Sequence, residues 1–88
     1  MPARDEPPRS AAALRYDRDA GGPPRVVAVG SGEVAERILE RARAAGVPVR
    51  EDAGLADALA RLELEAEIPP ELWVAVAETL VWAYGLTR

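Results

Sequence analysis

The chain has 88 residues, of which 49% are hydrophobic and 30% charged, and its formal net charge is -4. This length suits one small domain, near the lower limit at which a hydrophobic core is stable by itself. The absence of Cys and His excludes disulfides, thiol chemistry, imidazole catalysis and the usual zinc ligands. The acidic balance argues against nucleic acid as a partner, and no apolar run approaches the roughly 20 residues of a membrane span.

The first ten residues are rich in Pro and charge and lack the apolar stretch of a signal peptide. We expect residues 1–10 to form a flexible tail and residues 11–88 to form a single domain. The expected localisation is cytoplasmic.

Two strands and a helix are predicted in the first half of the domain. Ala11–Tyr16 is a short apolar run that favours a strand, although its alanines leave a helix open. The turn-forming residues 17–24 predict a loop, and the β-branched segment Arg25–Val29 predicts the clearest strand. Apolar residues at helical spacing then predict a helix over Glu33–Ala45, which Gly46 ends.

The second half begins with a predicted strand, Val47–Arg50, with Pro48 at its start or on an edge. With the strand and helix before it, this segment predicts a right-handed βαβ unit with parallel strands. Asp52 is expected to cap the next helix, whose face is formed by Leu55, Leu59 and Leu62. Residues 62–68 (LELEAEI) alternate apolar and acidic residues, which predicts a short extended segment.

Glu71–Tyr84 is predicted to be the last helix, beginning after Pro69-Pro70. Apolar side chains cover most of its circumference, more than one buried stripe requires, so a partner surface is expected on it. The predicted fold class is α/β: a small sheet of three to four strands with a βαβ unit, packed helices and a strongly apolar last helix.

The segment from Gly30 to Ala35 matches G-x-G-x-x-A, the pattern of a dinucleotide-binding turn, with acids about twenty residues later. Glu33, however, places a carboxylate where the pyrophosphate would bind, and the two anions would repel. The chain is also too short for a second mononucleotide half. We interpret the glycines as a tight turn and keep a nucleotide-binding fragment as the alternative.

No catalytic constellation is visible in the sequence. Serine and threonine lack a histidine to activate them. Glu63, Glu65 and Glu67 are interpreted as a solvated face, and they lack the loop geometry of a hard-cation site. We therefore expect no enzyme activity, no cofactor and no metal.

Six short segments are individually unspecific, but their order is specific: Ala13–Asp17 (ALRYD), Pro24–Ala28 (PRVVA), Gly46–Val49 (GVPV), Leu55–Leu59 (LADAL), Glu67–Pro69 (EIP) and Glu71–Glu78 (ELWVAVAE). This set, which extends over nearly all of residues 11–86, resembles the C-terminal cytoplasmic domain of the FlhB/YscU family of flagellar and type III export proteins. The resemblance implies a non-catalytic accessory module of protein export that contacts export substrates or membrane export-gate components. It also implies recruitment to the inner face of the plasma membrane.

The resemblance further implies an apolar docking patch for substrate signals. The matching positions in this sequence are Pro23, Pro24, Ala77 and Leu80. The simpler alternative is that Ala77 and Leu80 are ordinary core residues of an apolar helix. A generic interaction module unrelated to export is a further alternative.

The family cleaves itself at an Asn-Pro-Thr-His motif, where an Asn side chain attacks its own carbonyl. The corresponding positions in this sequence are Glu6, Pro7, Pro8 and Arg9, of which only Pro7 matches. Without the Asn nitrogen the attack has no nucleophile. The chain therefore resembles the already cleaved C-terminal fragment, made as a separate protein.

Overall fold

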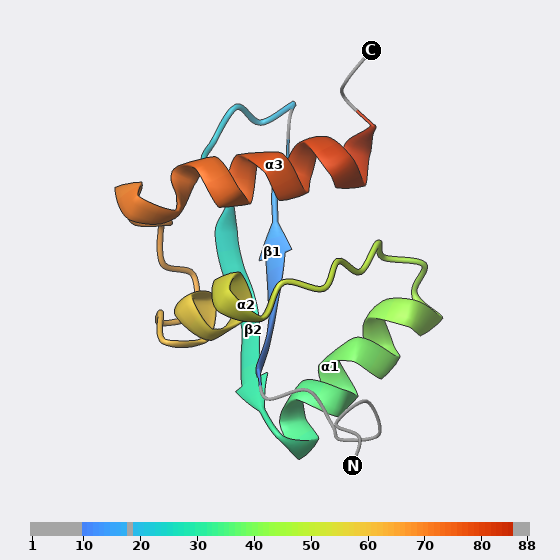
Figure 1. Ribbon diagram of the computed structural model, residues 1–88. Helices are drawn as coiled ribbons and strands as arrows, with labels where there is room; N and C mark the ends of the chain where they lie inside the picture. The colour runs from blue at the N-terminus through green and yellow to red at the C-terminus, as the bar shows by residue number, and fades with distance from the viewer. Residues whose placement is uncertain (1–9, 18, 86–88) are drawn as a thin grey trace.

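The computed structural model describes residues 10–17 and 19–85 of the chain (Figure 1). Within these residues the fold is mixed α/β, with a two-stranded sheet and three α-helices. Residues 1–9, which include the degenerate cleavage motif and all but the last residue of the predicted tail, lie outside the described residues. Ser10, predicted as the end of the tail, instead begins the first strand because it pairs with Ser31. The elements in chain order are β1 (Ser10–Arg15), β2 (Arg25–Ser31), α1 (Glu33–Ala44), α2 (Ala53–Ala60), the short 3-10 helix η2 (Pro70–Leu72) and α3 (Trp73–Tyr84).

The two predicted strands, β1 and β2, pair with each other as an antiparallel hairpin, a pairing that the sequence had not specified. The register pairs Ala13 with Ala28 but Leu14 with Val26, so Val27 is left without a direct partner. Such a bulge bends the strand locally and increases its twist. Val26, next to this bulge, is completely buried and forms part of the core.

The predicted βαβ unit and the sheet of three to four strands are wrong. Within the described residues the sheet has two antiparallel strands, and Val47–Arg50 is irregular. The physical reason lies in the backbone donors of this segment. The amide of Val47 donates to the Ala42 carbonyl (2.8 Å) at the end of α1, and Pro48 has no N–H group. The segment therefore lacks the first two donors that a sheet ladder would need.

Two of the predicted helix ends are confirmed by their hydrogen bonds. Gly46 has a positive φ of 76°, and its amide donates to Arg43 while that of Val47 donates to Ala42. These two bonds form a Schellman motif, which satisfies the last carbonyls of α1. The Asp52 side chain accepts from the Leu55 amide (3.1 Å), as expected of an N-cap.

The extended segment predicted over residues 62–68 is also wrong. A turn occurs at Leu64–Glu65, Glu65 has a φ of 66°, and only Glu67 forms a single bridge, with Arg25. The left-handed backbone at Glu65 is held by its neighbours: its amide donates to the Val26 carbonyl (2.7 Å), and its carbonyl accepts from Arg25 (2.8 Å). Because the turn breaks the alternation, Leu64 is 59% exposed.

The hydrophobic core lies where α2 and α3 meet the hairpin. In Figure 1, α2 lies in front of the two strands and α3 crosses them near one end. None of the helices in the described residues has both the length and the apolarity needed to span a bilayer. The buried side chains of the core come from β2, α2, the segment before η2, and α3: Val26, Leu55, Leu59, Ile68 and Val76.

Candidate functional site

An apolar groove of about 440 Å³ lies between α3 and the loop that joins β1 to β2. All four residues predicted to form the docking patch line it: Pro23 and Pro24 on the loop, and Ala77 and Leu80 on α3. The folded chain thus brings together two segments that lie more than fifty positions apart in the sequence.

The base of the groove is formed by residues that the sequence analysis did not assign to a site. Ile68 and Val76 are buried core residues that also line it. Trp73 forms part of the wall, and its indole Nε1 donates to the Ile68 carbonyl (2.8 Å). This hydrogen bond fixes the ring, which gives the groove a rigid aromatic side. Helical spacing from Ala77 back to Trp73 was the signal that could have identified this tryptophan.

The loop wall of the groove is tied to α3 where the loop begins. At its start, the Asp17 carboxylate accepts from the amide of Asp19 (3.0 Å), and Tyr16 packs edge-on against Tyr84 with ring centroids 6.1 Å apart. The Tyr84 hydroxyl donates to the Tyr16 carbonyl (2.8 Å), which ties the loop to the end of α3. At the loop's end the proline pair has its φ angles set by the rings. A wall ordered before binding loses little entropy when a ligand docks.

Among the described residues that line the groove, Glu67 is the single charged one. Its carboxylate forms a 3.5 Å ion pair with Arg25, while Arg15 pairs with Glu65 at 2.7 Å. These pairs are largely exposed and contribute little to stability. These two ion pairs and the backbone bridge between Arg25 and Glu67 hold the segment of residues 65–67 against the hairpin.

The two predicted positions on α3 differ in burial. Ala77 is exposed, so the interpretation as a core residue does not hold for it. Leu80 is half-buried and packs against the core cluster while also lining the groove. Leu80 therefore belongs partly to the core and partly to the wall of the groove.

The glycine-rich turn connects β2 to α1, but it lacks the surroundings of a dinucleotide site. β2 has no parallel neighbour in the described residues, and Glu33 is exposed at the start of α1. The glycines have steric reasons of their own. A Cβ at Gly30 would clash with the side chain of Val34. Gly32 adopts φ 56°, ψ -124°, a conformation that only glycine tolerates well.

We accordingly expect no binding of NAD, FAD or ATP. Isothermal titration calorimetry should give no heat beyond dilution, because Glu33 repels a phosphate at the helix start. Micromolar affinity for any of the three nucleotides would contradict this expectation. No three acidic side chains within the described ranges are grouped so as to hold a metal ion.

Solved C-terminal domains share this fold. The C-terminal domain of PscU matches with a TM-score of 0.78 and 34% sequence identity, covering 86% of this chain and 98% of that domain. A variant of the EscU/SpaS C-terminal domain matches with a TM-score of 0.81 and 27% identity, covering 91% of this chain and all of that domain. The chain therefore has the fold of the C-terminal domains of these proteins.

The sequence comparisons agree. A sequence model of the FlhB HrpN YscU SpaS family matches residues 5–83, and the chain belongs to this family. It is 42% identical over 85 residues to the flagellar biosynthetic protein FlhB of Escherichia coli (strain K12), which covers 96% of this chain and 22% of FlhB. It is 41% identical over 80 residues to YlqH of Bacillus subtilis (strain 168), covering 91% of this chain and 86% of YlqH. The chain thus spans about a fifth of FlhB but most of YlqH.

Proposed function

We propose that this domain is a non-catalytic binding module of bacterial flagellar or type III protein export. Its groove binds extended segments of export substrates or of apparatus proteins, in the cytoplasm and next to the membrane-embedded export gate. The observation that carries the proposal is that Pro23, Pro24, Ala77 and Leu80 line one apolar groove. The names of the relatives, a flagellar biosynthetic protein and the hypersensitivity response secretion protein HrcU, support export as the context.

The groove favours a particular kind of ligand. Its base of Ile68 and Val76 offers an apolar surface to one or two aliphatic side chains. The groove runs between the fixed ring of Trp73 and the proline wall. We expect this shape to accept an extended peptide segment rather than the broad surface of a folded protein. Selectivity would come from side-chain size more than from charge, because within residues 10–17 and 19–85 Glu67 alone among the lining residues is charged, and it already pairs with Arg25.

The test uses the two tryptophans of the chain. The Trp82→Phe variant leaves Trp73, which lines the groove, as the sole tryptophan. Titration with a synthetic peptide from the export signal of an early substrate should shift its emission to the blue, because the peptide excludes water from the ring. A scrambled peptide of the same composition is the control. An unchanged spectrum in a folded protein, or equal affinity for the scrambled peptide, would overturn the proposal.

We also predict that the protein does not cleave itself. Glu6 stands where the family's Asn would attack, so no side-chain nitrogen is available to form the cyclic intermediate. Intact-mass spectrometry after prolonged incubation at neutral pH should show one species with the full mass. Two fragments that correspond to a break between Glu6 and Pro7 would refute this.

A further inference from the structure

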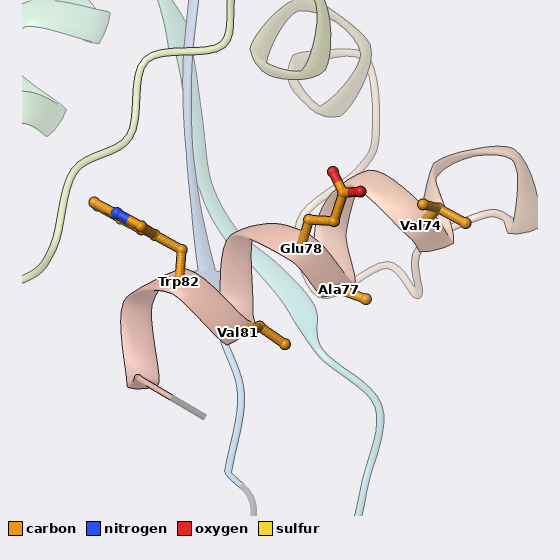
Figure 2. Close-up of a pocket in the computed structure, with 5 residues that line it drawn as sticks. All are labelled: Val74, Ala77, Glu78, Val81 and Trp82. Carbon is orange, nitrogen blue, oxygen red and sulfur yellow. The ribbon is translucent and has the colours of Figure 1, made fainter. Parts of the chain in front are cut away.

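A second apolar surface lies on α3, next to the groove but facing away from the hairpin. It consists of residues at helical spacing on one open face of the helix, and we call it the outer stripe. Figure 2 shows Glu78 and Trp82 projecting from one side of the helix, with Ala77 and Val81 on the adjoining side. The outer stripe is formed by Val74, Ala77, Glu78, Val81 and Trp82.

The outer stripe is not part of the core. α3 points Val76 into the core and packs Ala75 and Leu80 against it, which leaves the opposite side of the helix open. Val74 is 73% exposed and Trp82 is 50% exposed. Large apolar side chains gathered on one exposed face are typical of an interaction surface.

A carboxylate stands in the middle of this apolar face. Glu78 is exposed, and within residues 10–17 and 19–85 no ion pair neutralises it. Arg50 does reach α3, but its guanidinium donates to the Thr79 hydroxyl (3.0 Å). An acid flanked by Val74 and Trp82 favours a ligand that brings a cation to this position and apolar groups on both sides of it.

A second copy of the chain is a poor fit to the outer stripe. A two-fold pairing of the helices would bring two Glu78 carboxylates close together in an apolar contact, where like charges are costly. The stripe is also short: from Val74 to Trp82 the helix rises about 12 Å. Such a length offers far less than the roughly 800 Å² per partner that a stable dimer buries. One short helix of another protein would cover it.

We propose that the outer stripe binds an amphipathic helix of a partner protein, whose apolar face carries one Lys or Arg that pairs with Glu78. The helix lies along α3 with aliphatic residues against Val74, Val81 and Trp82. Anchors at helical spacing supply the affinity, and the charge pair sets register and direction. This site is separate from the peptide groove, although the two surfaces share Ala77 and Val81 as a common ridge.

The experiment uses the Trp73→Phe variant, in which Trp82 is the sole tryptophan and reports on the outer stripe. The probes are two synthetic helical peptides of about 18 residues, or five turns. Both peptides carry a stripe of leucines along one face of the helix. They differ at a single position next to this stripe, which is Arg in one peptide and Glu in the other. We expect the Arg peptide to bind about tenfold more tightly or better, with a blue shift of Trp82. In a Glu78→Lys variant the preference should reverse.

Controls separate this proposal from the others. Glu78→Gln should bring the two peptides to nearly equal affinity, and circular dichroism should be unchanged because Glu78 is exposed. Equal affinity of the two peptides for the unaltered Glu78 surface, or a Trp82 signal that does not respond, would overturn the proposal. The proposal would also be overturned if sedimentation velocity showed a dimer of the protein and the Val74→Lys substitution dissociated that dimer. The groove is tested separately, by Trp73 fluorescence in the Trp82→Phe variant. A negative result at the outer stripe therefore leaves the proposed function of the groove open to its own test.

Discussion

The Ala77→Asp variant is expected to bind an early-substrate peptide at least about tenfold more weakly than the unaltered protein, a loss of roughly 1.4 kcal/mol or more. Ala77 lines the groove and is exposed, so a carboxylate there is solvated in the free protein but must lose water when an apolar peptide docks. Trp73 fluorescence in the Trp82→Phe background measures the affinity.

The matched control is Ala53→Asp, which adds the same charge at an exposed helical position that does not line the groove. Asp at the first residue of α2 also lies at the favourable end of the helix dipole, so the fold should be undisturbed. Binding by this variant should equal that of the unaltered protein. If Ala77→Asp folds and binds just as well, the ligand lies elsewhere.

Leu80→Asp gives a less selective test of the same groove. Because Leu80 packs against the core as well as lining the groove, the substitution should reduce both binding and stability. Its thermal midpoint should therefore fall, whereas that of Ala77→Asp should change little. Equal midpoints for the two variants would show that Leu80 contributes nothing to the core.

The second large effect concerns stability. Leu59→Ala should lower the free energy of unfolding by roughly 2–5 kcal/mol, because Leu59 is 3% exposed within the core cluster and its loss leaves a cavity. Domains of this kind have total stabilities on the order of 5–15 kcal/mol, so the variant approaches the limit of folding. Urea denaturation followed by circular dichroism measures the change.

Leu64→Ala is the control for Leu59→Ala. It removes the same side-chain atoms from a position that is 59% exposed, and its effect should be within about 0.5 kcal/mol. A large loss of stability at Leu64 would mean that the turn at residues 64–65 packs more closely than the structure shows. A small loss at Leu59 would mean that the core tolerates the cavity by collapsing around it.

Local signals in the sequence predicted the first two strands, one helix start and one helix end. A short apolar run and a β-branched run, separated by turn formers, predicted β1 and β2. Asp52 and Gly46 marked a helix start and a helix end. These features depend on a few neighbouring residues and their own hydrogen bonds, which is why they can be predicted from the chain alone.

Local signals failed where the backbone donors were used elsewhere. Val47–Arg50 has the composition of a strand, but the helix end takes the Val47 amide and Pro48 has none. Residues 62–68 alternate as a strand does, yet Arg25 and the Val26 carbonyl hold a left-handed turn at Glu65. The turn at Glu65 depends on partners distant in the sequence, which periodicity does not report. The irregular segment after α1 depends instead on how that helix ends, which the strand-like composition of the segment does not show.

The sequence by itself determined the apolar character of α3 and, through the resemblance, four positions of the groove. Only the tertiary structure decided how the apolar surface of α3 is divided among the core, the groove and the outer stripe. Apolar periodicity shows which positions share a side of a helix, but not which side another element covers. Here the hairpin and α2 cover the side of Val76, the proline loop stands beside Ala77, and Val74 remains exposed.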